Sequence, residues 1–505
     1  MTWFKAINRT AQQIILGAFL FTPFFGFTQN LNIPLNQSFN VQLERSMLAS
    51  EEVIHSSFKP ILLRDSKHED QVPSLNIRHS KRSWVAKRLF HDHFITLDSG
   101  SFKLTIDPIV NFEFGADNEF DARAEPSLYK NTRGFVARLQ FGEKVGIEST
   151  FRENQAVLPF YLHERIRLSG VAYGQGRTKT FKDIGFDFAM ASAYISVSPN
   201  ERINIQAGTG KHFIGNGHRS LLLSDLSFNS PFLRINTNWL GGKLQYQNLY
   251  TLHQELNRIV STSTISEGLF ERKQMATHYL EYAPNNKFSI ALFESTVFPS
   301  LDTSGNISVG FNYWLPILFL NTIAEAESSK GNNKLGLNLN YNLINTIQFY
   351  GQLSLQSEEI NYQVGVKVFP YKSLLLQAEF NKISDQNGAD LFTHYNESLA
   401  HPVSYEASEV VWIAQFQKNR WLTRTTANFI LNDNVDVAFF DIRQSFIVNP
   451  SYNFTLHVGA NIRQTEEFEP LPLGDIYQGG SSMLLNSNFI YIGLSTNLQN
   501  IYTNY

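Results

Sequence analysis

The chain has 505 residues with no cysteine, a net charge of -3, 17% charged residues and 13% aromatic residues. The lack of cysteine excludes disulfides, thiol nucleophiles and thiolate metal sites, and the small net charge argues against a nucleic-acid partner. Ordinary soluble domains have roughly 25% charged residues, so this composition is unusual for a chain of several soluble domains. Composition does not change after residue 100, which favours one large repetitive architecture.

Residues 1–29 have the pattern of a secretory signal peptide. Lys5 and Arg9 precede an apolar run from residue 14 to residue 27, and a cleavage site is expected near Thr28 or Gln29. An uncleaved anchor helix is the weaker alternative, because the apolar run is shorter than the roughly 20 residues that a membrane-spanning helix needs. We therefore expect an exported protein whose mature chain begins beyond the inner membrane.

Residues 30–95 are polar and show no regular period, and we expect them to form a solvated periplasmic segment. They hold a cationic stretch made of Lys59, Arg64, Lys67, Arg78, Lys81, Arg82, Lys87 and Arg88. A contact of these cations with lipid phosphates or with an anionic glycan is the alternative. Three apolar residues could pack the segment against the part of the chain that follows: Trp84, Phe90 and Phe94.

From residue 96 to the C-terminus, apolar and polar residues alternate with a period of two. Residues 135–141 read FVARLQF, residues 142–144 form a turn, and residues 145–152 alternate again, which predicts a β-hairpin. The pattern returns at 335–341 and 347–355, at 362–368 and 374–380, and at 454–462. These strands reach roughly nine residues or more, which approaches the length that crosses a bilayer at a tilt.

The connections between these strands alternate in length. They are tight near 142–144, 240–243, 370–373, 417–420 and 449–452, and long near 253–274, 325–333, 381–409 and 464–487. The polar face is rich in Asn, Gln, Thr and Ser, which suits a wet lumen better than the solvated face of a soluble sandwich. We therefore predict an all-β fold over residues 96–505, an antiparallel transmembrane outer-membrane β-barrel of about 16–18 strands in contact with outer-membrane lipid.

Residues 208–231 interrupt this alternation with glycines, cations and three consecutive leucines. We expect the segment to fold into the lumen or to lie on the rim of the barrel. Its polar residues would either fix the segment in place or meet an anionic polysaccharide. The candidate ligand-binding or plug residues are Lys211, His212, His218, Arg219 and Asp225, together with three aromatic loop residues that could stack on sugar rings, Tyr395, Tyr405 and Tyr477.

Several stretches of the chain resemble a known family. They are NTRGF at 131–135, FRENQAVLPFY at 151–161, GTGKHFIGNGHRSLLLSD at 208–225 and FIYIGLSTNLQN at 489–500. Together they resemble the Bacteroidetes outer-membrane proteins related to the capsule-assembly protein Wzi, and among these the RemB-like gliding-motility branch. IHSSFKP at 54–60 is similar to the segment that precedes the barrel in these proteins. His218 departs from the pattern, because relatives usually have an aromatic residue there.

The resemblance implies a non-enzymatic barrel that organises or anchors surface polysaccharide, such as capsule or slime, or that supports gliding motility. It implies surface polysaccharide and capsule-export or gliding-machinery proteins as partners, and it supplies no catalytic residue. A diffusion channel for small solutes is the alternative function.

Two chemical alternatives concern the histidines. A lipase-like hydrolase would use residue types present at His212, His218, Ser220, Ser224 and Asp225, but the segment lacks the G-x-S-x-G elbow that exposes a nucleophile. A metal site would need the fold to bring together His91, His93, His212 and His218, with no cysteine to assist them. We therefore predict no catalytic residue, no metal and no cofactor.

Overall fold

The computed structural model describes residues 30–78, 80–118, 128–182, 184–258, 270–299, 311–325, 333–356, 359–384, 391–403, 405–433, 436–465, 469–470, 482–483 and 485–504. The expected signal peptide at 1–29 and the candidate Tyr477 lie outside the described residues.

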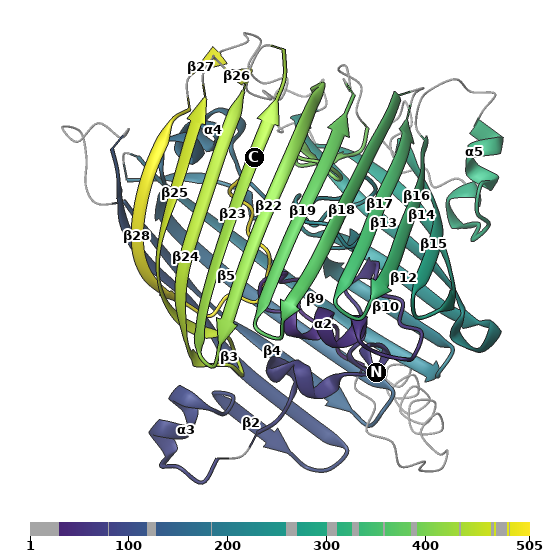
Figure 1. The fold of residues 1–505 in the computed structure, drawn as a ribbon, viewed down its shortest axis with the longest axis horizontal. Helices are drawn as coiled ribbons and strands as arrows, with labels where there is room; N and C mark the ends of the chain where they lie inside the picture. Colours follow the sequence, from purple (N-terminus) through teal and green to yellow (C-terminus); the bar gives the residue numbers. More distant parts are fainter. Residues whose placement is uncertain are drawn as a thin grey trace, which may run out of the picture.

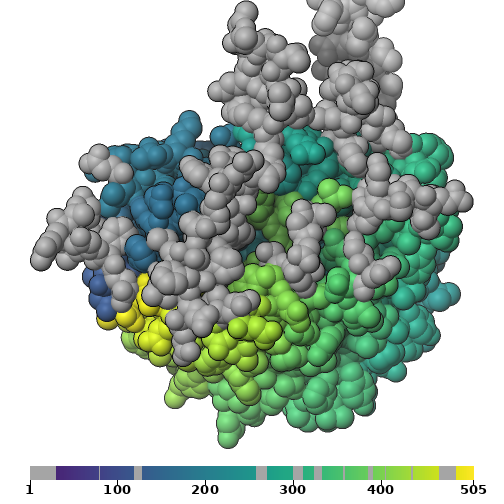
Figure 2. Space-filling model, turned by 90° about the horizontal axis from the view of Figure 1, so that it is seen from above, coloured from purple at the N-terminus to yellow at the C-terminus, as the bar shows by residue number. Residues whose placement is uncertain are grey.

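Antiparallel strands form one closed barrel in which each strand pairs with its neighbours in the chain (Figure 1). Within the described residues the barrel has 18 strands, and the ring closes where β28 pairs with β3. Seen from one end, the colours run round the molecule in chain order (Figure 2). The strands are β3 (Phe102–Asp117), β4 (Leu128–Phe141), β5 (Val145–Val157), β9 (Gly185–Asn200), β10 (Ile203–Gly210), β12 (Ser230–Trp239), β13 (Leu244–Arg258), β14 (Phe270–Asn285), β15 (Phe288–Pro299), β16 (Asn333–Ile344), β17 (Ile347–Gln356), β18 (Glu359–Tyr371), β19 (Leu374–Ile383), β22 (Ala407–Lys418), β23 (Trp421–Leu431), β24 (Val437–Asn449), β25 (Phe454–Thr465) and β28 (Ser487–Ser495). The predicted antiparallel barrel is confirmed, at the upper end of the expected strand number.

The alternation along each strand separates an outer apolar face from an inner polar face. In β4, Phe135 and Phe141 keep 44% and 40% of their surface exposed, whereas Arg138 and Gln140 between them are buried. In β18, the outward Val364 is 55% exposed. The apolar face suits lipid, and closure of the ring gives every strand hydrogen-bonding neighbours on both sides, which a bilayer cannot supply.

The two rims of the barrel differ. Tight turns such as 142–144, 286–287 and 372–373 join neighbouring strands at one rim, where the first described residues also lie (Figure 1). Longer connections, among them 211–229 and 384–406, join the strands at the other rim. They hold α4 (Phe160–Ser169), α5 (Leu320–Glu325), β6 (Val171–Ala172), β7 (Gly176–Arg177), β8 (Lys179–Phe181), β11 (Phe213–Ile214), β20 (Thr393–His394), β21 (Glu397–Ser398), β26 (Glu469–Pro470) and β27 (Ser482–Met483).

Residues 30–78 pack inside the short-turn end of the barrel, which differs from the solvated segment expected here. They hold α2 (Val41–Leu48) and β1 (Phe58–Lys59), and β1 pairs with β11 in the interior. Their own small core consists of Leu31, Ile33, Leu43, Ile61, Leu63, Val72 and Leu75. These apolar residues are irregularly spaced, so no helix or strand period reveals them in the sequence.

A part of one long connection, residues 311–325, lies on the outside of the barrel. Its Tyr313 packs edge-on against Tyr250, and the carboxylate of Glu294 accepts hydrogen bonds from the backbone N–H groups of Phe319 (2.5 Å) and Thr322 (2.9 Å). Glu294 faces outward, since its neighbour Phe293 belongs to the interior cluster. The connection therefore shields a carboxylate that lipid would not solvate. Among the described residues, no helix is both long and apolar enough to cross a membrane.

Candidate functional site

Two glycines let the chain leave the wall after β10 and approach the opposite strands. The segment from residue 211 to residue 229, named the plug loop here, crosses the interior before β12 begins. Gly215 has a φ of +130°, and a Cβ atom there would collide with the Gln352 side chain. A Cβ atom at Gly217 would collide with the Glu379 carboxylate. A larger residue at either position would push the loop away from the wall.

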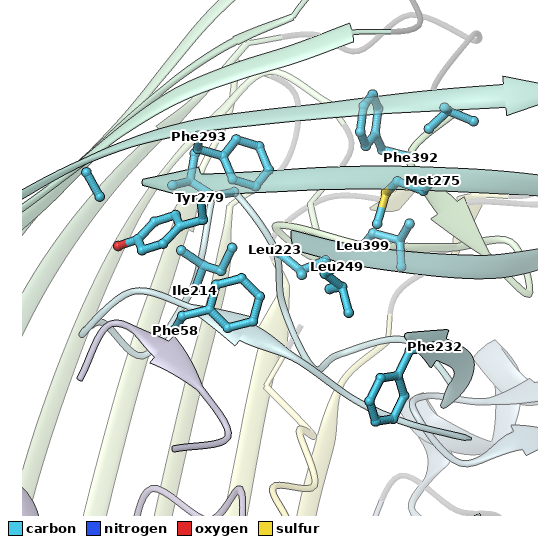
Figure 3. Close-up of a cluster of buried hydrophobic side chains, with 13 residues drawn as sticks. Phe58, Ile214, Leu223, Phe232, Leu249, Met275, Tyr279, Phe293, Phe392 and Leu399 are labelled. Atoms are coloured by element: carbon cyan, nitrogen blue, oxygen red, sulfur yellow. The ribbon is translucent and has the colours of Figure 1, made fainter. Parts of the chain in front are cut away.

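The plug loop is part of a hydrophobic cluster between the interior segments and one side of the wall (Figure 3). Leu223 O accepts a hydrogen bond from Ile214 N (2.8 Å), and Ser224 N donates to Leu399 O (2.7 Å). The cluster contains Phe58, Ile214, Leu222, Leu223, Phe232, Leu249, Met275, Tyr279, Ala291, Phe293, Val297, Phe392 and Leu399. Because burial of each large apolar side chain stabilises by about 1.5–3 kcal/mol, the loop is held as a piece of the core.

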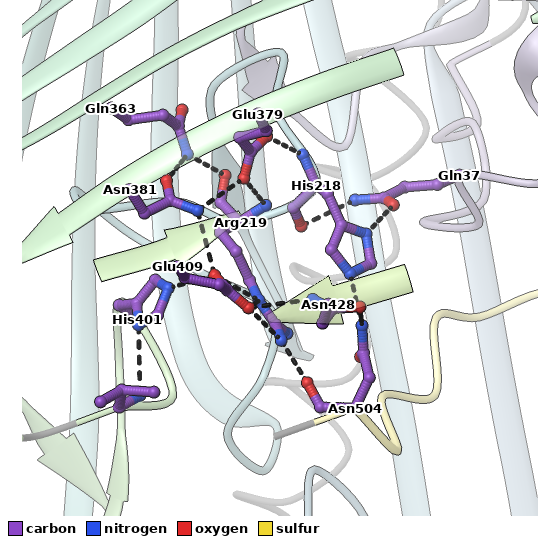
Figure 4. A network of polar contacts seen from close by, with 11 residues as sticks. Gln37, His218, Arg219, Gln363, Glu379, Asn381, His401, Glu409, Asn428 and Asn504 are labelled. Carbon is purple, nitrogen blue, oxygen red and sulfur yellow. Dashed lines mark hydrogen bonds and ion pairs between the residues drawn. The ribbon is translucent and has the colours of Figure 1, made fainter. Parts of the chain in front are cut away.

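A polar network fastens the loop to another part of the wall (Figure 4). The Arg219 guanidinium donates from Nε (3.1 Å) and Nη2 (2.9 Å) to Glu409 Oε1. The backbone N–H groups of His218 (2.7 Å) and Arg219 (3.0 Å) donate to the Glu379 carboxylate. The Arg219 side chain is only 2% exposed and that of Glu409 is fully buried. Such charge-assisted bonds away from water fix one geometry of the loop.

Glu409 gathers donors from several parts of the chain. Its oxygens also accept hydrogen bonds from His401 Nε2 (2.7 Å), Asn381 Nδ2 (3.0 Å) and Asn428 Nδ2 (2.9 Å). Arg219 Nη2 donates in addition to the backbone carbonyl of Asn504. The carboxylate therefore joins the plug loop, two strands, the connection 384–406 and the last described residues in one buried cluster.

His218 and Asp225 connect the plug loop to both ends of the described chain. His218 Nδ1 lies 3.0 Å from Gln37 Oε1, and its Nε2 lies 3.0 Å from Asn504 Nδ2. Asp225 accepts hydrogen bonds from the Tyr502 hydroxyl (2.8 Å) and from Asn500 Nδ2 (2.9 Å). Burial, with Arg219 beside it, holds the pKa of His218 well below its ordinary value. The imidazole is therefore neutral, and it donates at Nδ1 and accepts at Nε2.

Lys211 and Glu397 connect three long connections near the opposite rim. Lys211 Nζ donates to Gly174 O (2.7 Å) and Asp225 O (3.0 Å). Glu397 accepts hydrogen bonds from Gly174 N (3.0 Å) and Phe228 N (3.1 Å). Burial raises the pKa of Glu397 to about 8 and lowers the pKa of Lys211 to about 8. At neutral pH the Glu397 carboxyl is therefore largely protonated.

This carboxyl makes the closed arrangement of the connections depend on pH. Because the pKa of Glu397 is raised from 4.5, its stabilising effect is complete below pH 4.5 and is lost as pH rises to about 8. We expect protection of the Gly174 and Phe228 amides against hydrogen exchange, corrected for intrinsic rates, to fall by roughly tenfold or more over this range, because a pKa difference of one unit alone corresponds to a factor of ten. The lowered pKa of Lys211 restores stability only above pH 8. In the Glu397→Gln variant, protection of these two amides should not change with pH below pH 8. If protection fell equally steeply with pH in the wild type and the variant, the assignment to Glu397 would be contradicted.

The other predicted site residues lie apart from the Arg219 network. His212 contacts the rings of Phe58 and Phe232 edge-on, with centroid distances of 6.1 and 4.6 Å, and burial holds its pKa well below the ordinary value. Tyr395 stacks on Phe228 with ring centroids 4.9 Å apart. Tyr405 is partly buried and packs against the cluster that contains Val403. The structure thus brings the five plug-loop candidates into the interior and leaves Tyr395 and Tyr405 in the connection 384–406.

The geometry gives no support to the hydrolase or metal alternatives. Ser220 Oγ donates to Ile214 O (2.6 Å), and Asp225 is bound to Tyr502 and Asn500, so neither residue orients a histidine. His93 Nδ1 lies 2.6 Å from Asp107 Oδ2, and both residues lie outside the plug loop. In the part of the chain that the structure describes, no group of three or more His, Cys, Asp or Glu side chains is arranged to hold a metal.

A cavity of about 570 Å³ lies between the interior segments and the wall. Arg424 of β23 and Arg443 of β24 face each other directly across the strands and line it. Arg443 Nη2 lies 2.8 Å from His457 Nδ1, and its buried Nε has no hydrogen-bond partner among the described residues. Asp441 and Glu113 line the same cavity, and their carboxylates offset part of the positive charge. Like charges directly opposite on a sheet are destabilising, so the two guanidinium groups favour anionic neighbours, which these carboxylates supply in part.

Aromatic rings line the same cavity as the two arginines. The cavity lining includes Tyr129, Tyr161, Phe439, Tyr491 and Tyr502. Sequence reasoning missed this site, although the alternation of β23 and β24 places both arginines on the inner face. A count of inward cations on neighbouring strands would have indicated it, but their meeting depends on a register that the sequence does not specify.

Comparison with known proteins agrees with this architecture. No family model matches the chain, and no curated protein matches it. The solved structure of Wzi, an outer-membrane protein involved in group 1 capsule assembly in Escherichia coli and a carbohydrate-binding β-barrel, covers 92% of this chain and 98% of its own at 10% identity, with a TM-score of 0.54. The chain shares its fold with an outer-membrane barrel.

Two further solved structures align less well. OccAB2 of Acinetobacter baumannii covers 78% of this chain and 98% of its own at 12% identity, with a TM-score of 0.44. OprD of Pseudomonas aeruginosa covers 77% of this chain and 94% of its own at 7% identity, with a TM-score of 0.41. At such identities the similarity concerns the fold alone.

Proposed function

We propose that this protein is a non-enzymatic outer-membrane barrel that organises or anchors anionic surface polysaccharide, such as capsule or slime. The observation that carries the proposal is the cavity that Arg424 and Arg443, which face each other, line together with aromatic rings. Guanidinium groups form forked hydrogen bonds with carboxylate or phosphate on sugars, and aromatic faces pack on sugar rings. The cavity therefore suits an acidic sugar unit.

The plug loop has a supporting role in this proposal. Four of its side chains are bound to other residues of this chain and so hold the loop in place: Lys211, His218, Arg219 and Asp225. The cavity and the aromatic loop residues are then the parts that contact the glycan. The Wzi barrel, which has the same fold, binds carbohydrate and takes part in capsule assembly. We carry that role to this chain as part of the proposal.

Export is proposed from the signal-peptide pattern of residues 1–29. The proposed partners, capsule-export or gliding-machinery proteins, rest instead on the sequence stretches that resemble RemB-like proteins of Bacteroidetes. A role in gliding motility rests on the same stretches. Colony spreading of a strain that lacks the gene tests the gliding role. Loss of a protein needed only for capsule retention would leave spreading unchanged.

A diffusion channel is the second candidate function, and the interior cavity of about 570 Å³ is the observation that favours it. The packed plug loop and residues 30–78 oppose it, because both occupy the interior. A channel would conduct ions, whereas a closed scaffold would not.

Binding of acidic oligosaccharides by the purified barrel tests the proposal. We expect Arg443→Gln to weaken binding of a uronic-acid oligosaccharide by roughly tenfold or more, since a hydrogen bond to a charged group contributes about 1.5–3 kcal/mol. Binding of a neutral oligosaccharide should change little. Arg202→Ala, at an exposed turn residue, is the matched control. Equal affinities of the wild type and Arg443→Gln for the acidic ligand would refute the site.

A further inference from the structure

A short helix and a short strand extend from the barrel at its short-turn rim (Figure 1). They are α3 (Trp84–Phe90) and β2 (Ile95–Asp98), and α3 buries none of its side chains. Trp84, Val85 and Leu97 keep 64%, 57% and 54% of their surface exposed. Leu89, Phe90, Phe94 and Ile95 are exposed as well. A contiguous apolar surface of this kind marks a place of contact with another apolar phase.

The helix is fixed in position rather than loosely attached. The backbone carbonyl of Arg88 accepts hydrogen bonds from Asn449 Nδ2 (2.8 Å) and the Tyr452 hydroxyl (2.8 Å), and that of His91 accepts one from Ser451 Oγ (2.6 Å). These donors belong to the end of β24 and the turn that follows it. The apolar side chains of α3 are therefore held at the rim, outside the protein core.

The strand β2 extends the outer face of the barrel toward this helix. Ile95 pairs with Ile106 and Leu97 pairs with Leu104 on β3. These positions share the outward face of β3 with Phe114, which is 57% exposed. The apolar surface of β2 is thus continuous with the apolar face of the barrel, which faces lipid.

Cations accompany these apolar residues. Residues 80–88 contain four Lys or Arg residues and no Asp or Glu, and Lys81 and Arg82 are exposed. A segment that combines Trp and Leu with several Lys and Arg residues suits the interface of an anionic membrane, where rings enter the headgroup region and cations meet phosphates.

We propose that residues 80–97 form a membrane-surface anchor that binds anionic phospholipid of the leaflet at the short-turn rim. The anchor orients the rim against the headgroups, and it acts independently of any glycan bound in the cavity.

Depth-dependent quenching in vesicles tests this anchor. The chain lacks cysteine, so Val85→Cys and Glu52→Cys each give one site for an environment-sensitive fluorophore. Glu52 is the control, because its side chain is 67% exposed and lies in a polar stretch of the same N-terminal region. The full-length protein is reconstituted in phosphatidylcholine mixed with phosphatidylglycerol, with nitroxides at the headgroup level. We expect several-fold stronger quenching at position 85, whereas equal quenching at both positions would overturn the proposal.

The cations have a separate test. In the Val85→Cys background, Lys81→Glu with Arg82→Glu should reduce quenching in the mixed vesicles to the level seen in phosphatidylcholine alone. These exposed residues lie outside the interior core, so the barrel should still fold, and unheated and heated samples of the variant should still migrate differently on SDS gels. Quenching that does not depend on phosphatidylglycerol, or on these two charges, would refute recognition of anionic lipid.

Discussion

Replacing Arg219 with methionine is expected to destabilise the barrel by about 3–5 kcal/mol, because it leaves the buried Glu409 carboxylate without its cationic partner. Asn381, Asn428 and His401 still donate to this carboxylate, but burial keeps His401 largely neutral by lowering its pKa. Neutral donors do not offset the cost of a charge removed from water. Unfolding by urea in lipid vesicles, followed by tryptophan fluorescence, measures the loss.

Two further variants show whether the loss belongs to the buried pair. Adding Glu409→Gln to Arg219→Met removes the unpaired charge and should recover a large part of the stability. Lys382→Met breaks the exposed pair with Glu406 and should cost less than about 1 kcal/mol. If Arg219→Met were as mild as Lys382→Met, the plug loop would not be fastened by this network.

Replacing Val364 with arginine is expected to cost about 2–4 kcal/mol of folding free energy in lipid, since the outward residue lies near the middle of β18. The same substitution at Tyr371, at the end of that strand and 71% exposed, should cost only about 0–1 kcal/mol. Folding yield and unfolding curves, measured for both variants in vesicles of the same bilayer thickness, give the two free-energy costs. Equal, small effects at the two positions would mean that water rather than lipid surrounds the barrel.

The barrel could be predicted from the sequence because membrane strands obey a simple rule. Each strand of roughly ten residues must place apolar side chains outward, and the alternation in segments such as 135–141 records that requirement directly. The alternation of short turns and long connections indicates which end of each strand lies at the short-turn rim and which lies at the rim with the long connections. Register was not needed for either conclusion, since a change of register by two residues leaves the faces unchanged.

The interior could not be predicted in the same way. Leu31, Leu43 and Val72 fill the short-turn end of the barrel, but they follow no period and read as part of a polar segment. Arg219 indicates that a buried carboxylate is needed, yet Glu409 is one of many in the sequence. Likewise, Arg424 and Arg443 meet only through the register of two strands. Contacts between distant segments depend on closure of the ring, which no local pattern encodes.

The central claim is that the chain's own segments close the interior of the barrel, so that it serves as a scaffold with a binding cavity. Single-channel recording in planar bilayers tests this claim most directly, because an open barrel of 16–18 strands leaves an aqueous channel. We predict that the purified wild-type protein inserts with almost no ionic current, and that Arg219→Met shows transient openings. Steady, ohmic current from the wild type, comparable to that of an open porin, would contradict the account.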